Sequence, residues 1–207
     1  GGGKDVKTCL IIGNGPSLAN VPNEFLAKYP TFGSNRVYLK FTPDYYSYLD
    51  KHFVGKNIEE IKQLDCKAKY IRREYALKVP GAIPMRQAGG LGFSFDPLDF
   101  VYGGYTITYT NLQLAYWHGF ERVGLIGVDH EYKDAGDPLT WHTGKDKSHF
   151  SKDYYAEDET WLINDFSNTE PFYKLARRVY ERDGREIVNL TDGGALEIFE
   201  REDWRDW

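Results

Sequence analysis

The segment Leu10–Leu18 (LIIGNGPSL) combines residue types that can bind an anion at the end of a buried strand. Glycine permits a tight turn and a close approach of a ligand to the backbone. Proline suits the first position of a helix, where backbone N–H groups point outward and can bind a phosphate. The pattern therefore predicts a nucleotide-binding loop, with a plain strand-to-helix turn as the alternative. The residues expected to contact the nucleotide are Gly13, Asn14, Gly15, Pro16 and Ser17.

Two well-known phosphate-binding loops differ from this one. A Walker A loop ends in Gly-Lys-Ser/Thr, and that ending is absent here. The dinucleotide fingerprint requires a third glycine where Leu18 stands, and an acidic residue about 20 positions on, where Ser34-Asn35-Arg36 is found. These differences disfavour an NAD-binding site and an ATP-binding P-loop.

Further polar residues follow other predicted strands and should lie at the same edge of the sheet. They include Ser34–Arg36, Asp50 and Asp129–Tyr132. Asp129 is a candidate for binding a metal or a ribose hydroxyl, and equally for a helix cap or a buried hydrogen-bonding carboxylate. Thr106 and Thr108 open a predicted helix, so we expect their hydroxyls and backbone amides to face the same crevice.

Histidine supplies the candidate base. His149, in Ser148-His149-Phe150, could remove a proton from an acceptor hydroxyl, or be an ordinary surface histidine. His130 and His142 are further candidates. Asp50, Asp129 and the histidines could form a metal site, although no tight ligand spacing supports one, so the metal stays unknown. The basic residues that could meet a phosphate are Arg36, Lys145 and Lys147.

Apolar runs alternate with helical patterns along the chain. This alternation predicts an α/β fold: a Rossmann-like open parallel sheet with helices on both faces, in one domain over 4–207. A glycine- and proline-rich irregular excursion is expected at about 79–105, over the pocket or the sheet edge, and a polar active-site loop at about 130–160. The expected strands are Thr8–Ile12, Thr31–Asn35, Tyr45–Leu49, Ala68–Arg72, Arg122–Val128 and Glu186–Leu190. The expected helices are Pro22–Tyr29, Ile58–Leu64, Tyr109–Gly119 and one through Phe172–Tyr180.

The bulk composition narrows the classes of partner. The 207 residues carry a net charge of −5 without a long basic run, which argues against a nucleic-acid partner. No apolar stretch approaches the roughly 18 residues of a membrane span, and the N-terminus lacks the apolar core of a signal peptide. The two cysteines predict neither a disulfide framework nor a zinc site, and fit a reducing cytoplasm. A homo-oligomer is compatible with these features.

Several segments resemble the MptE-like family, which is named for an archaeal-type 6-hydroxymethylpterin diphosphokinase. Many of its members are encoded as polysaccharide or cell-surface glycan proteins. The resemblance covers most of the chain, apart from residues 79–105. The matching segments are Leu10–Leu18, Ser34–Arg36, Tyr45–Asp50, Leu112–Asp129, Ser148–Phe150, Pro171–Asp183 and Ile187–Phe199.

The Gly-Asn-Gly-Pro-Ser loop is also similar to that of bacterial sialyltransferases that use CMP-sialic acid, enzymes with a Rossmann-like sheet and no metal requirement. This resemblance implies that Asn14 and the loop backbone contact the nucleotide. It makes Asn35, the Thr106–Thr108 segment and Asp129 counterparts of family site residues. Two departures concern catalysis. The Gly-His-Ser that holds the family's base is absent after Ser148-His149-Phe150, and Tyr132 is offset by one position from the phosphate-contacting tyrosine.

Three functions follow. The first is a nucleotide-binding, glycosyltransferase-like enzyme of surface-glycan synthesis, with His149, Asp129 and Tyr132 as catalytic candidates. Its donor would be a CMP- or UDP-type nucleotide sugar and its acceptor a glycan or a small hydroxylated molecule, with Mg²⁺ possible but not required. The second is a Mg²⁺-dependent diphosphokinase that moves pyrophosphate from ATP to a hydroxymethyl acceptor. The third is a non-catalytic protein that binds a nucleotide or sugar phosphate.

Overall fold

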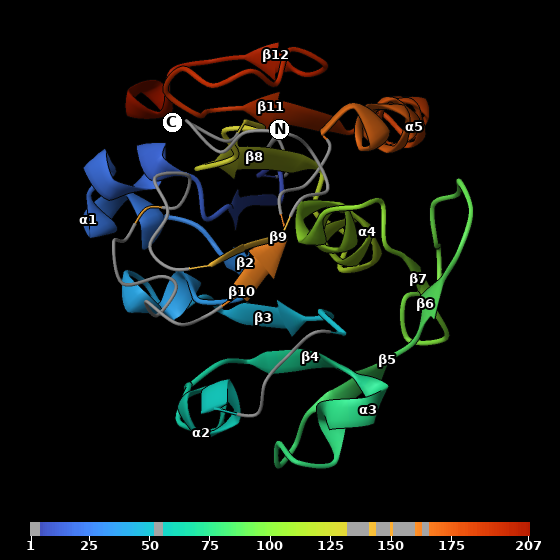
Figure 1. Ribbon diagram of the computed structural model, residues 1–207. Helices are drawn as coiled ribbons and strands as arrows, with labels where there is room; N and C mark the ends of the chain where they lie inside the picture. The colour runs from blue at the N-terminus through green and yellow to red at the C-terminus, as the bar shows by residue number, and fades with distance from the viewer. Residues whose placement is uncertain (1–4, 52–55, 132–140, 144–149, 151–159, 163–165) are drawn as a thin grey trace.

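The computed structural model describes residues 5–51, 56–131, 141–143, 150, 160–162 and 166–207. Eight parallel strands form one open sheet in the order β12-β11-β8-β1-β2-β3-β4-β5 (Figure 1). Their bounds are β1 Thr8–Ile12, β2 Thr31–Ser34, β3 Tyr45–Tyr48, β4 Ala68–Arg72, β5 Ile83–Met85, β8 Arg122–Ile126, β11 Glu186–Asn189 and β12 Glu200–Arg201. The predicted parallel sheet is confirmed.

The central strands are buried on both faces, as their continuous apolar runs predict. Cys9 and Ile11 of β1 point toward one core, while Leu10 and Ile12 point toward another. Gly124 of β8 pairs with Leu10, and a Cβ at Gly124 would lie 2.9 Å from the Trp207 ring. Glycine at that position therefore makes room for an aromatic side chain against the sheet.

Helices cover both faces, as expected (Figure 1). On one face α4 (Ile107–Trp117) and α5 (Glu170–Arg182) pack over Cys9 and Ile11. On the other face lie short helices. They are η1 (Pro16–Asn20), α1 (Asn23–Leu26), η2 (Val37–Leu39) and α2 (Lys56–Lys62). The predicted helix Pro22–Tyr29 is real but only one turn long, because the chain enters β2 at Thr31.

The 79–105 segment is more regular than its glycine content predicts. Ile83–Met85 joins the sheet as β5, and β6 (Gln87–Ala88) pairs in parallel with β7 (Val101–Tyr102). Gln113 of α4 fixes the segment: its Oε1 accepts from the N–H groups of Ser94 and Tyr102, both at 3.0 Å. Of the two expected places, the segment occupies the sheet edge, where β5 is the last strand, and it packs against α4.

The C-terminal part contains a strand that the sequence did not predict. After β11 the chain returns and adds β12, with Val188 opposite Glu200. The following turn, η4 (Trp204–Asp206), brings Trp207 into the core, where it is 5% exposed. The remaining elements are α3 (Arg73–Ala76), β9 (Trp141–Thr143), β10 (Thr160–Leu162) and η3 (Phe166–Asn168), with β9 and β10 antiparallel to each other. Across the described ranges, no helix has the length and apolarity needed to cross a bilayer.

Candidate functional site

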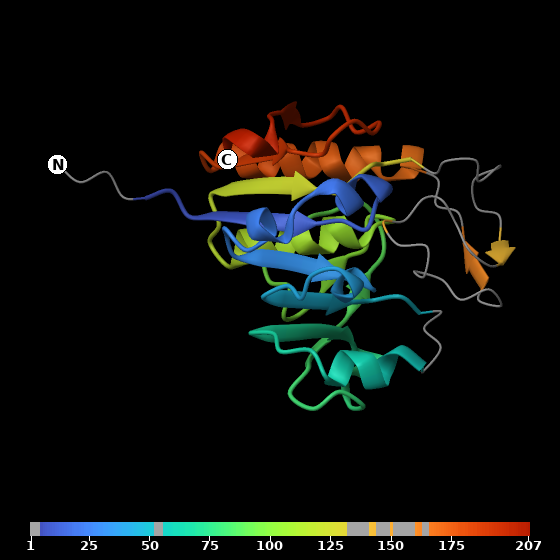
Figure 2. The ribbon, with the colours of Figure 1, turned by 90° about the vertical axis from the view of Figure 1, so that its left-hand side faces the viewer.

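The site lies where the chain changes direction across the sheet. From β1 the chain runs through β2, β3, β4 and β5 on one side, and then crosses to β8 and β11 on the other. The carboxyl ends of the strands all point to one edge, and β9 and β10 lie beyond that edge (Figure 2). Ligands of open α/β sheets bind at this edge, at the point where the strand order reverses. Here that point lies between β1 and β8.

The glycines after β1 are required by the neighbouring strand. Gly13 N–H donates to the Ile126 carbonyl at 2.7 Å, and Gly15 N–H donates to the Gly127 carbonyl at 2.8 Å. A Cβ at Gly13 would lie 2.4 Å from the Gly127 oxygen, and one at Gly15 would lie 2.5 Å from the Asp129 carboxylate. Close packing of two loops explains both glycines before any ligand is considered.

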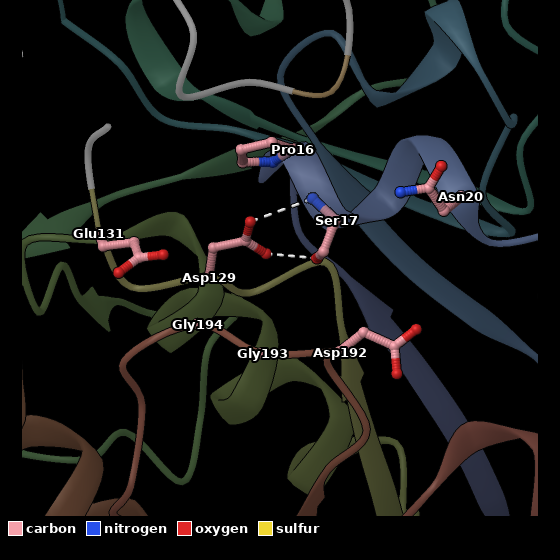
Figure 3. A pocket seen from close by; sticks show the side chains of 8 residues that line it. All are labelled: Pro16, Ser17, Asn20, Asp129, Glu131, Asp192, Gly193 and Gly194. Carbon is pink, nitrogen blue, oxygen red and sulfur yellow. Dashed lines mark hydrogen bonds between the residues drawn. The ribbon is translucent and has the colours of Figure 1, made fainter. Parts of the chain in front are cut away.

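Asp129 holds the first turn of η1. Its Oδ2 accepts from the Ser17 N–H at 3.1 Å, and its Oδ1 accepts from the Ser17 hydroxyl (Figure 3). Asp129 is only 6% exposed, so a carboxylate of the protein takes the donors that were expected to meet a phosphate. The next N–H, of Leu18, donates to the Gly15 carbonyl at 3.1 Å. The expectation that the Ser17 side chain and N–H are available to an anion is therefore corrected.

The side chain of Asn14 has an acceptor that no described residue uses. Its Nδ2 donates to the Ser34 carbonyl at 3.2 Å, which fixes which end of the amide is the oxygen. Its Oδ1 is buried, and no described group donates to it. A buried acceptor without a donor is unfavourable, so this oxygen suits a ligand that brings an N–H or O–H group.

Ser34, whose carbonyl accepts from Asn14, belongs to a closed ring of side-chain hydrogen bonds with Ser47 and Asn111. Ser47 Oγ donates to Asn111 Oδ1 at 2.8 Å, and Asn111 Nδ2 donates to Ser34 Oγ at 2.8 Å. The remaining contact, Ser34 Oγ to Ser47 Oγ at 2.7 Å, must then use the Ser34 proton, because a hydroxyl carries only one. All three side chains are buried. The ring ties β2 and β3 to α4.

Asn35, the next predicted site residue, stands at the same edge after β2. Its backbone adopts a left-handed φ of 55°, which asparagine tolerates better than most residues. Its carbonyl accepts from the Tyr46 hydroxyl at 2.7 Å. The contact holds the Asn35 backbone.

Figure 3 shows the pocket next to this region, with a volume of about 320 Å³. Among the predicted residues, Pro16, Ser17 and Asp129 line it, while Asn14, Asn35, Thr106 and Thr108 do not. Glu131, within the predicted Asp129–Tyr132 segment, also lines it, and the lining residues that the sequence reasoning missed are Asn20, Asp192, Gly193 and Gly194. Asp192–Gly194 directly follow the predicted strand Glu186–Leu190, so the same carboxyl-edge rule could have found them.

Thr106 and Thr108 contact α5. Thr106 caps α4, its Oγ1 accepting from the Thr108 N–H at 3.4 Å. Burial raises the pKa of Tyr173 to about 12, and the nearby Thr106 and Thr108 side chains act to lower it. The two residues thus join the starts of α4 and α5 at the carboxyl edge.

His130, one of the candidate bases, is buried beside the site. Its backbone has a left-handed φ of 57°, a strained conformation that is commonest at functional sites. Its Nε2 lies 3.5 Å from Glu170 Oε1 without a hydrogen bond from any described group. Burial lowers the pKa of the imidazole below its usual value, and Glu170 offsets part of that effect.

Several predicted residues lie outside the described residues. They are Tyr132, the side chain of His142, Lys145, Lys147 and His149. Within the described ranges, no three His, Cys, Asp or Glu side chains converge on a point where a metal could bind. Asp129, one predicted Mg²⁺ ligand, uses both carboxylate oxygens to accept from Ser17. Mg²⁺ is usually held by one or two carboxylates together with substrate phosphates, so the Mg²⁺-dependent diphosphokinase stays a prediction.

Comparison with known proteins gives a likeness of fold. No family profile matches the sequence, and no curated protein is similar to it. A solved structure, described as a MAf glycosyltransferase from Magnetospirillum magneticum AMB-1, matches with a TM-score of 0.53 and 14% identity. The match covers 97% of this chain and 34% of the other. The chain thus spans about a third of that protein's length, and at this identity the likeness shows the fold.

Proposed function

We propose that this chain binds a nucleotide or nucleotide sugar at the β1–β8 switch point and acts as a glycosyltransferase-like enzyme. The observation that carries the proposal is the buried Oδ1 of Asn14 at that switch point, to which no described group donates. The fold likeness to a protein described as a glycosyltransferase supports it. Membership of the MptE-like family and a role in surface-glycan synthesis belong to the same proposal.

The nucleotide would meet Asn14 first. Its Oδ1 is an acceptor, so it suits the amino group of a base or a ribose hydroxyl better than a phosphate. Asn35 would contact the same ligand from the end of β2. A CMP- or UDP-type donor is the proposed class. Ser17 contributes through Asp129, by fixing the loop.

The proposed transfer displaces the nucleoside phosphate from the sugar. The acceptor hydroxyl gives its proton to a base and its oxygen forms a bond to the anomeric carbon. The bond from that carbon to the phosphate oxygen breaks, and the electron pair leaves with the phosphate. His149 is the proposed base and Tyr132 the proposed phosphate contact. Asp129 is proposed as a positioning residue.

A panel of nucleotides and nucleotide sugars, with and without Mg²⁺, tests the proposal by thermal shift. A ligand that binds the native state raises the melting temperature by mass action. CMP or UDP compounds should stabilise the protein without Mg²⁺. AMP formation from ATP that depends on Mg²⁺ would instead indicate a diphosphokinase. Nucleotide binding without turnover of any donor would indicate a binding protein, and no stabilisation by any nucleotide would contradict the proposal.

A further inference from the structure

The charged side chains that line the pocket in Figure 3 are all carboxylates. Three carboxylates surround it, from Asp129, Glu131 and Asp192, and the described lining includes no lysine, arginine or histidine. A carboxylate accepts hydrogen bonds and cannot donate them. The lining therefore matches a ligand that carries hydroxyl or ammonium donors.

The charges of these carboxylates are compensated unequally. Asp192 is paired with Arg205 at 3.1 Å and accepts from Trp204 Nε1 at 3.0 Å. Among the described residues, only the neutral Ser17 donates to the Asp129 carboxylate. No described cation forms an ion pair with Asp129 or Glu131. Negative charge facing the pocket would repel a phosphate placed there.

The walls of the pocket are built to keep its shape. The Ala195 N–H donates to the Asp129 carbonyl at 2.8 Å. Gly194, with φ of 75°, packs so closely that a Cβ would lie 2.7 Å from the same carbonyl oxygen. On the same loop, Arg205 and Trp204 fix the Asp192 carboxylate. The pocket is thus formed before any ligand binds.

The size of the pocket limits its ligand. Ligand pockets commonly enclose roughly 300–1,000 Å³, and this one, at about 320 Å³, is at the lower end. It can hold one monosaccharide-sized group, and a complete nucleotide sugar would exceed it. Asn14, the proposed nucleotide contact, does not line it. The nucleotide and the group in the pocket are then different parts of the substrates.

We infer that this pocket holds a hydroxyl-rich group that is neutral or carries an amine, and that it excludes phosphate. The inference rests on the proposed function for the role of that group, which is the transferred sugar or the sugar acceptor. The charge preference itself depends only on the lining residues.

Three probes with the same ring test it: glucose, glucosamine and glucose 1-phosphate. The Trp204 indole N–H, which donates to a lining carboxylate, reports occupancy in ¹H–¹⁵N NMR spectra, and Trp204→Phe identifies its signal. Glucosamine should bind most tightly and glucose 1-phosphate most weakly. Glu131→Gln should reduce the preference for glucosamine over glucose roughly two- to fivefold, the range for one partly exposed charge pair.

Glu121→Gln is the matched control, because Glu121 is an exposed carboxylate at the start of β8, at the opposite edge of the sheet. It should leave the preference unchanged. Tighter binding of glucose 1-phosphate than of glucose, or no shift of the Trp204 signal with any probe, overturns the inference. Nucleotide binding is measured on the same samples. The expected sugar order without nucleotide binding would refute only the proposed function, and nucleotide binding with the reverse order would refute only this inference.

Discussion

Asp129 accepts two hydrogen bonds from Ser17, one from its backbone N–H at 3.1 Å and one from its hydroxyl. These bonds join the loop after β1 to the loop after β8 at the switch point of the sheet. The Gly-Asn-Gly-Pro-Ser motif therefore has a structural role that does not depend on a ligand. Its Ser17 donors bond to a carboxylate of the protein, where a phosphate could have bound.

Ser17→Ala should lower the free energy of unfolding by about 1–3 kcal/mol, because it removes a hydrogen bond to a buried charged group. Urea unfolding measures the change. Thr8→Val is the control, since the Thr8 hydroxyl donates to a backbone carbonyl at an exposed site and its loss should cost under about 0.5 kcal/mol. Equal effects of the two substitutions would show that the Ser17–Asp129 contact contributes no more to the free energy of unfolding than an exposed hydrogen bond does.

Gly15→Ala should destabilise the protein by about 1–3 kcal/mol through overpacking. The added Cβ would lie 2.5 Å from the Asp129 carboxylate and 2.8 Å from the Gly127 carbonyl oxygen. Gly89→Ala is the matched control, because a Cβ there meets nothing within 4 Å and its backbone is not left-handed. Thermal melting of both variants is the measurement. A neutral Gly15→Ala would mean that the two loops separate easily.

Ser47→Ala should open the ring that Ser34, Ser47 and Asn111 form. It leaves the Asn111 Oδ1 and the Ser34 proton without their partners, and each buried unsatisfied group costs about 1–3 kcal/mol. Chemical unfolding should show the loss. The Asn14 N–H₂ signals in NMR spectra should also shift, because Asn14 donates to the Ser34 carbonyl. A stability change under about 0.5 kcal/mol would contradict the ring.

Stability should decrease as the pH falls below about 6.5, the ordinary pKa of histidine. Burial lowers the pKa values of both His118 and His130, so the unfolded chain binds protons at a higher pH than the folded chain does. The stabilisation is complete above the unfolded pKa and is lost as the pH falls toward the folded values. Unfolding measured from pH 8 to 5 should show this slope. His118→Gln should reduce it, and an unchanged slope in both His118→Gln and His130→Gln would contradict the assignment.

The sequence predicted the sheet well because its strands are short, mainly apolar segments bounded by turn residues. Thr8–Ile12 and Ala68–Arg72 match β1 and β4 residue for residue. It did not predict β12, because Glu200 and Arg201 are both exposed at the sheet edge and carry no apolar signal. It also did not predict that Gln113 would bind the 79–105 segment to α4, since a polar residue that bonds to distant backbone has no local pattern.

The sequence could indicate which loops meet at the candidate site, but not the contacts between them. The carboxyl-edge rule brought Pro16, Ser17 and Asp129 to one pocket. It could not show that Asp129 would bind the Ser17 donors, because that depends on the distance between two loops separated by more than 100 residues. For the same reason it could not show that no described residue would donate to Asn14 Oδ1.

Nucleotide binding at the switch point is the central claim, and isothermal titration calorimetry of CMP and UDP tests it most directly. The wild-type protein should bind at least one of them. Asn14→Ala should weaken binding by about tenfold, or roughly 1.4 kcal/mol, while Asn23→Ala, which removes a similar Nδ2 bond to a backbone carbonyl at an exposed site, should not. Binding that is equal in the wild type and both variants, or absent from the wild type, would contradict the account.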